Sequence, residues 1–121
     1  MKKAVVVLDA DTRQCHETCA AIEEWGFVTT ALHSLGELNA FIGKQAGAVI
    51  VMDIDTIQID NRTIRKMVLE NPGTYFLCLS RDRFHPELKD AICYHIFACI
   101  NKPVDPEELY FCLKSIFEDQ D

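Results

Sequence analysis

Five short apolar segments alternate with helical patterns, and this alternation constrains the fold more than any other feature of the sequence. The segments predict strands at residues 4–8, 27–31, 48–52, 75–79 and 97–100. Between them, apolar residues recur at the three- and four-residue spacing of amphipathic helices. Repeated strand–helix units are typical of a parallel sheet covered by helices on both faces. We therefore expect an α/β fold of five such units, (βα)5, forming a doubly wound five-stranded parallel sheet.

Several helix boundaries are also predicted. Asp105 followed by Pro106 is typical of a helix start, because aspartate caps the first turn and proline suits its first position. Ser34 and Glu37 have the spacing of a capping box. A fourth helix is expected to begin near Pro86. These boundaries agree with five strand–helix units.

Length and charge restrict the class of protein. The 121 residues suffice for one domain, which we expect to span residues 1–121. No apolar segment approaches the roughly 20 residues that cross a bilayer, and the first one lacks a signal-peptide cleavage site, so we expect a cytoplasmic protein without a membrane span. The net charge of −7 argues against nucleic-acid binding by this domain, since phosphate backbones bind clustered Lys and Arg.

Six cysteines raise the question of disulfides or metal, but no C-x-x-C motif occurs. Cys78 and Cys99 lie in apolar segments, where a free cysteine packs as a small hydrophobic residue. Cys15 and Cys19 are one helical turn apart, and we expect both to face the core. A metal cluster of these two with His16 is the alternative.

Polar side chains stand where four of the predicted strands end. Asp9 and Asp53 follow two strands directly, Ser80 follows a third, and Lys102 comes just after the last. Carboxyl ends of parallel strands meet at one edge of a sheet, so we expect these side chains to converge. Each of them alone could be a cap, a turn residue or a solvated charge. Together, a nucleophilic carboxylate, a cation and a hydroxyl are suited to accepting a phosphoryl group.

The order of these residues resembles the receiver domain of bacterial two-component response regulators, over essentially the whole chain. The resemblance rests on Asp9, Asp53, Ser80 and the pair Lys102-Pro103, each after the appropriate strand. It implies a flavodoxin-like sheet of strand order 2-1-3-4-5. It also implies that Asp53 accepts a phosphoryl group from the phosphohistidine of a sensor histidine kinase or phosphotransfer protein. Ser80 would bind the phosphoryl oxygens, Lys102 would pair with Asp53, and the Lys102-Pro103 peptide bond would be cis.

Magnesium is the expected cofactor. Two neighbouring carboxylates repel each other unless a cation joins them, and Mg²⁺ prefers oxygen ligands. The resemblance implies that Asp9, Asp53 and the backbone carbonyl of Asp55 bind the metal. Receiver domains usually have two adjacent acids after the first strand, but here Ala10 stands in place of the second acid. Asp11, one residue further along, is the candidate replacement, and we expect the loss of a direct ligand to weaken metal binding.

Two further positions depart from the receiver pattern. Arg81 stands where a small residue is common, and its guanidinium could narrow access to the acceptor or pair with Asp55 or Asp82. Cys99 replaces the aromatic residue that usually moves inward when the hydroxyl approaches the phosphate. Phe97, on the same face of its strand, is a candidate substitute.

Three functions compete. The first is a phosphorylation switch, not a conventional enzyme, that assists only its own phosphoryl transfer and dephosphorylation. Its kinase phosphorylates Asp53, and the surface around the expected fourth helix, the strand at 97–100 and the last helix changes partner or forms a homodimer. The resemblance also leaves room for an output domain outside this sequence.

The second function is a degenerate receiver that acts as a dimerisation or docking module without phosphorylation, which Ala10, Arg81 and Cys99 favour. The third is an enzyme or cofactor binder of flavodoxin-like shape. Such sites need a Gly-, Ser- or Thr-rich phosphate loop after the first strand, whereas this chain has an Asp-Ala-Asp run that would repel phosphate.

Overall fold

The computed structural model describes residues 4–42, 48–81, 96 and 98–119. Within them lies a five-stranded sheet of order β2-β1-β3-β4-β5, whose neighbouring strands are all parallel. The strands are β1 (Ala4–Leu8), β2 (Val28–Leu32), β3 (Val49–Asp53), β4 (Tyr75–Ser80) and β5 (Ala98–Asn101). The predicted flavodoxin-like architecture and its strand order 2-1-3-4-5 are confirmed.

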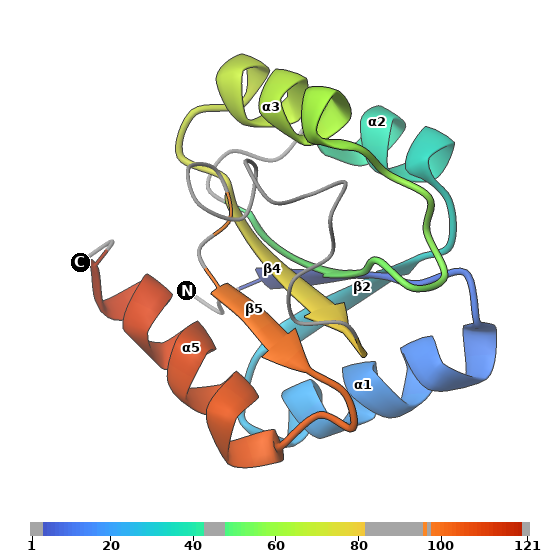
Figure 1. The fold of residues 1–121 in the computed structure, drawn as a ribbon. Helices are drawn as coiled ribbons and strands as arrows, with labels where there is room; N and C mark the ends of the chain where they lie inside the picture. The colour runs from blue at the N-terminus through green and yellow to red at the C-terminus, as the bar shows by residue number, and fades with distance from the viewer. Residues whose placement is uncertain (1–3, 43–47, 82–95, 97, 120–121) are drawn as a thin grey trace.

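Helices cover both faces of this sheet. The described helices are α1 (Thr12–Glu24), α2 (Leu35–Ile42), α3 (Asn61–Glu70) and α5 (Pro106–Asp119). In Figure 1, α2 and α3 lie on one side of the sheet, and α1 and α5 lie on the other. The fourth helix expected near Pro86 lies outside the described residues, as do Asp82 and Phe97.

Each face of the sheet has its own hydrophobic core, because successive strand residues point to opposite faces. In β1, Val5 and Val7 belong to the core shared with α1 and α5. Val6 and Leu8 belong to the core shared with α2 and α3. All five residues of β3 are buried, as expected of a central parallel strand with helices on both sides.

The buried cysteines are part of these cores. Cys15 and Cys19 face the core beneath α1, whereas His16 is exposed, which supports the packing prediction over a metal cluster. Desolvation by burial, with the nearby thiol of Cys19, raises the pKa of the Cys15 thiol to about 12. Cys78 is buried in the core on the opposite face.

Local signals place the helix ends to within a residue or two. The α1 helix ends at Glu24, and Gly26 follows with a φ of 92°, where a side chain would be strained. The second strand begins at Val28, one residue later than predicted, and Phe27 stacks on Phe117 with ring centroids 5.4 Å apart. The cap at Asp105 is present, since its carboxylate accepts the backbone N–H of Glu107 at 2.9 Å.

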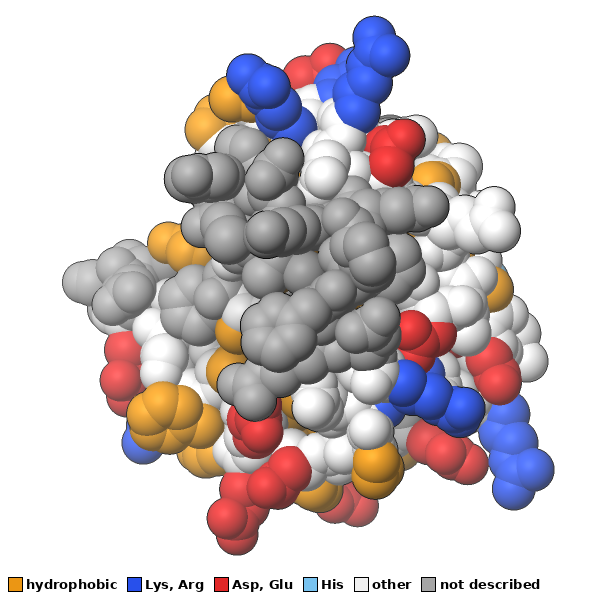
Figure 2. All heavy atoms as spheres, in the orientation of Figure 1, with side chains coloured by type: hydrophobic (Ala, Val, Ile, Leu, Met, Phe, Trp, Pro, Cys, Tyr) orange, Lys and Arg blue, Asp and Glu red, His pale blue; other side chains and the backbone are white. Residues whose placement is uncertain are grey.

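Charged side chains are unevenly spread over the surface. Figure 2 shows basic side chains over α3, and acidic side chains mixed with basic ones where α1 and α5 lie. The α3 helix carries Arg62, Arg65 and Lys66, and α5 begins with Glu107 and Glu108 in its first turn. Within the described residues, no helix has the length and apolar character of a membrane span.

Candidate functional site

Four strands of the sheet bring polar side chains to one rim. β3 ends at Asp53 and β4 at Ser80, while Asp9 directly follows β1. These three are the polar or charged side chains that are buried in the described part of the chain. Lys102 follows β5, and its backbone N–H donates to the carbonyl of Ser80 at 3.0 Å. The convergence expected of parallel strand ends is therefore present.

Asp53 is held by donors on both carboxylate oxygens. Its Oδ1 accepts the backbone N–H groups of Asp55 and Thr56, at 3.0 and 3.1 Å. Its Oδ2 accepts from the Lys102 ammonium at 2.6 Å and from the Gln14 amide at 2.6 Å. Asp53 is 1% exposed, so its charge is balanced by the protein rather than by water.

Lys102 is shared between two carboxylates. Its Nζ lies 2.6 Å from Asp53 and 3.4 Å from Asp55. Desolvation acts to lower the pKa of Lys102, but the hydrogen bond and charge of Asp53, with the charge of Asp55, outweigh it and raise the pKa above its ordinary value. The ammonium is therefore a permanent cation beside Asp53. The peptide bond to Pro103 is cis, as the resemblance implied.

Asp55 lies at the rim, and its carboxylate accepts a hydrogen bond from the Ser80 hydroxyl. Ser80 Oγ donates to Asp55 Oδ1 at 3.1 Å, and the backbone N–H of Arg81 donates to Asp55 Oδ2 at 2.9 Å. Desolvation acts to raise the pKa of Asp55, but these two hydrogen bonds and the charge of Lys102 outweigh it and lower the pKa. Ser80 thus reaches the predicted rim, with its hydroxyl directed at Asp55.

Arg81 contacts Asp55 through its backbone rather than its guanidinium. In the part of the chain that the structure describes, no ion pair joins the two side chains. The other proposed partner, Asp82, lies outside that part. Cys99 is half-buried against the core shared with α2 and α3. Phe97, the candidate substitute for the aromatic residue that Cys99 replaces, lies outside the described residues.

Asp9 is fixed by residues from three segments. Its Oδ1 accepts the hydroxyl of Thr56 at 2.9 Å and the backbone N–H of Asp11 at 2.9 Å. Its Oδ2 accepts the Gln14 amide at 2.5 Å. The Thr56 hydroxyl in turn accepts the backbone N–H of Ala10 at 3.1 Å. Thr56 therefore ties the loop after β3 to the loop after β1.

Gln14 and Thr56 are the site residues that sequence reasoning missed. The Gln14 amide nitrogen lies between Asp9 Oδ2 and Asp53 Oδ2, and it must be the nitrogen that faces them because carboxylates only accept hydrogen bonds. A usable signal existed. The helix that follows β1 starts beside the rim, and Gln14 lies in its first turn. Thr56 is three residues beyond Asp53, within a turn that its backbone N–H closes.

The residues present do not fit a resident Mg²⁺. Asp9 and Asp53 are together, but the side chain of Ala10 has no ligand atom. Asp11 is not with them, because its carboxylate caps α1 by accepting the backbone N–H of Gln14 at 3.1 Å. Within the described residues, no group of three His, Cys, Asp or Glu side chains could hold a metal ion. Coordination by the backbone carbonyl of Asp55 stays a prediction.

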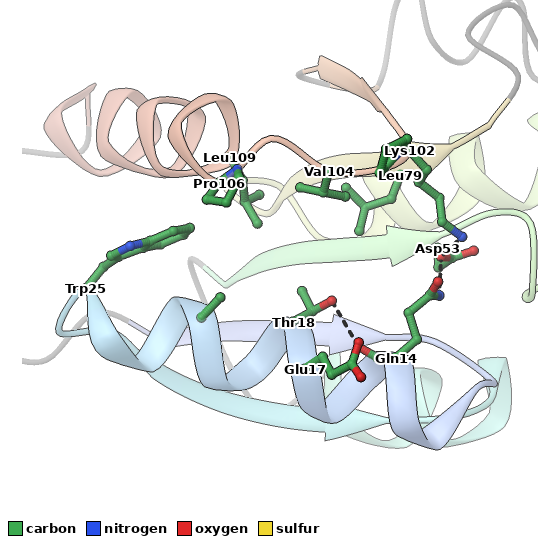
Figure 3. Close-up of a pocket in the computed structure, with 12 residues that line it drawn as sticks. Gln14, Glu17, Thr18, Trp25, Asp53, Leu79, Lys102, Val104, Pro106 and Leu109 are labelled. Atoms are coloured by element: carbon green, nitrogen blue, oxygen red, sulfur yellow. Dashed lines mark hydrogen bonds and ion pairs between the residues drawn. The ribbon is translucent and has the colours of Figure 1, made fainter.

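A cavity of about 310 Å³ reaches this rim from the side of α1. It lies between α1 and the segment that leads from β5 into α5. Figure 3 shows Asp53, Lys102 and Gln14 at one end of the cavity and Trp25 at the other. Asp53, although only 1% exposed, therefore borders this cavity together with Lys102.

Comparison with known proteins finds similarity in structure rather than in sequence. No family model matches the chain. Curated proteins give no match either. Among solved structures, a CheY-like response regulator receiver domain protein from Methanospirillum hungatei JF-1 has a TM-score of 0.86 and 21% identity, with 99% of this chain and 97% of that chain covered.

Two other structures are similar over comparable lengths. A two-component response regulator from Clostridium difficile has a TM-score of 0.85 and 16% identity, with 99% of each chain covered. The beryllofluoride-activated NtrC4 receiver domain dimer has a TM-score of 0.83 and 21% identity, with 98% of each chain covered. With the strand order and the acidic rim described above, these similarities show that the chain has the fold of response regulator receiver domains.

Proposed function

We propose that this domain is a phosphoacceptor of a two-component phosphorelay and that Asp53 is the residue phosphorylated. The observation that carries the proposal is the buried contact of 2.6 Å between Lys102 Nζ and Asp53 Oδ2. It puts a permanent cation beside a carboxylate nucleophile, at the end of a cavity. Phosphoryl transfer depends mainly on positioning and on charge stabilisation, which this arrangement supplies.

The proposed reaction uses the groups already at the rim. A carboxylate oxygen of Asp53 attacks the phosphorus of a phosphohistidine, so that an O–P bond forms and the P–N bond breaks. The leaving imidazole nitrogen takes a proton from water, and an acyl phosphate remains on Asp53. Lys102 offsets the charge that the arriving phosphoryl oxygens bring. The Ser80 hydroxyl, which now donates to Asp55 at 3.1 Å, turns to the phosphoryl oxygens and thereby links phosphorylation to the loop after β4.

The partners follow from this chemistry. The donor would be a sensor histidine kinase or a phosphotransfer protein, and we place the exchange in the cytoplasm because a kinase that renews the phosphohistidine consumes ATP. One structurally similar protein is a receiver domain dimer, so we propose that phosphorylation changes a homodimer contact that includes β5 and α5. The net charge of −7 is unsuited to nucleic-acid phosphates. We propose no enzymatic activity beyond the domain's own phosphoryl transfer and dephosphorylation.

Magnesium is a secondary element of the proposal. Added Mg²⁺ would find the two carboxylates of Asp9 and Asp53 but no third one, so we propose that it binds weakly. The experiment below therefore includes an arm without metal.

A second function is favoured by one observation. The Gln14 amide bridges Asp9 and Asp53 at 2.5 and 2.6 Å, so the acceptor carboxylate is already engaged. A degenerate receiver that serves as a docking or dimerisation module would have such a closed site.

Incubation with acetyl phosphate, with and without Mg²⁺, separates the two functions when intact mass is measured. A phosphoryl adduct on the wild type, absent from Asp53→Asn, is the expected result. Asp60→Asn is the matched control, because Asp60 caps α3 away from the rim and Asn caps a helix about as well as Asp. A wild-type protein that dimerises but takes up no phosphoryl group in either arm would establish the docking module.

A further inference from the structure

The side-chain amide of Gln14 occupies the space between two buried carboxylates. Its Nε2 lies 2.5 Å from Asp9 Oδ2 and 2.6 Å from Asp53 Oδ2. Two carboxylates this close repel each other unless a donor or cation is placed between them. The amide supplies its two N–H groups to the pair, one to each carboxylate.

We propose that Gln14 is a built-in substitute for a divalent cation: it holds Asp9 and Asp53 together without metal and keeps Mg²⁺ out of the pair. The inference concerns the metal and does not require Asp53 to be phosphorylated.

The other contacts of the pair leave little room for a metal ion. Asp9 Oδ1 accepts from the Thr56 hydroxyl and the backbone of Asp11, and Asp53 Oδ1 accepts from two backbone N–H groups. Asp53 Oδ2 also accepts from Lys102. An entering ion would have to displace the Gln14 amide to reach both Oδ2 atoms. Mg²⁺ requires near-octahedral geometry and loses its water ligands reluctantly, so two carboxylates do not compensate well for the lost waters.

The backbone of Gln14 is fixed independently of its side chain. Its N–H donates to the capping carboxylate of Asp11 at 3.1 Å, and its carbonyl accepts the hydroxyl of Thr18 at 3.0 Å. Helix α1 thus presents the amide to the rim in a set position. A substitution at Gln14 consequently changes the group between the carboxylates without removing the helix cap.

Gln14→Glu and Gln14→Met test the inference. The glutamate variant puts a third carboxylate beside Asp9 and Asp53, which creates a metal site of three acids. The methionine variant keeps a similar length but has neither donor nor charge. Melting temperature is measured in EDTA and in MgCl₂, and Mn²⁺ binding is followed by titration calorimetry and by fluorescence of Trp25, the single tryptophan of the chain, which lines the same cavity.

The wild type is expected to melt at nearly the same temperature in EDTA and in MgCl₂. Both variants should melt lower than the wild type in EDTA, because the carboxylates lose their bridge. In MgCl₂, Gln14→Glu should recover, and it should bind Mn²⁺ at least ~10-fold more tightly than the wild type. If Gln14→Glu fails to fold in EDTA but folds in MgCl₂, the same conclusion follows.

Two results would overturn the inference. One is a wild type that MgCl₂ stabilises as much as it stabilises Gln14→Glu. The other is a Gln14→Met variant whose melting temperature in EDTA equals that of the wild type. These readouts are independent of phosphoryl transfer. A tighter metal site in Gln14→Glu, together with no adduct on Asp53 under any condition, would reject the proposed function and leave this inference intact.

Discussion

Lys102 Nζ and Asp53 Oδ2 are 2.6 Å apart although 49 residues separate them in the chain. The Lys102 side chain is 10% exposed and that of Asp53 is 1% exposed, so the pair is largely removed from water. Such pairs are poor evidence of net stabilisation, but the loss of one partner leaves a buried, uncompensated charge. The contact therefore matters for both the stability and the chemistry of the rim.

Replacement of Lys102 by Met should destabilise the domain by roughly 3 kcal/mol, because Asp53 would keep its burial and lose its cation. Urea unfolding gives the free-energy difference. Lys114→Met is the matched control, since Lys114 pairs with Glu118 at 3.9 Å and both side chains are more than half exposed. Equal stability of the two variants would contradict the prediction.

Acid should weaken the fold through Asp55. The pKa of Asp55 is lowered in the folded state, so its contribution is present above the ordinary value of 3.8 and is lost as the pH falls through the lower folded value. The free energy of unfolding should thus fall more steeply for the wild type than for Asp55→Asn as the pH is lowered below about 5. Parallel curves for the two proteins would show that Asp55 does not titrate in this way.

Thiol labelling of the native protein should distinguish the cysteines. The thiolate is the reactive form, and burial raises the pKa of Cys15 to about 12 and also raises that of Cys78. Iodoacetamide should therefore modify the half-buried Cys112 well before either of them. Peptide mass spectrometry over time measures the order. Early modification of Cys15 in the folded protein would mean that its side of the core opens readily.

Phe111 on α5 is 69% exposed, and we expect it to take part in the proposed homodimer. Phe111→Ser should weaken dimerisation by ~10-fold or more, because exposed aromatic side chains often dominate the energy of an interface. Leu69→Ser on α3 is matched in exposure, at 67%, and should leave dimerisation unchanged. Sedimentation equilibrium after acetyl phosphate treatment gives both constants. An equal effect of the two substitutions would exclude a specific role for α5.

Much of the rim could be predicted from the chain because strand ends are locally encoded. Apolar runs that stop at Asp9, Asp53 and Ser80 identify the carboxyl ends of parallel strands, and the topology of such a sheet gathers these ends at one edge. The cis bond before Pro103 followed from the resemblance. These features depend on periodicity and on the order of elements, which a sequence displays directly.

The partners of those side chains were decided by packing. Asp11 was the candidate replacement for the missing acid, but its carboxylate caps α1 by accepting the backbone N–H of Gln14. The space beside Asp9 and Asp53 is instead filled by Gln14, which lies 39 residues before Asp53 and whose place in the first turn of α1 is its one signal in the sequence.

The sequence by itself thus determined the parallel sheet, its two buried faces and the polar residues at the strand ends, because burial patterns arise within each element. Only the tertiary structure decided that a glutamine amide lies between the two carboxylates and that the Ser80 hydroxyl is directed at Asp55. Hydrogen bonds between distant segments depend on how α1 and the loop after β3 lie against the sheet, and no local sequence pattern determines that arrangement.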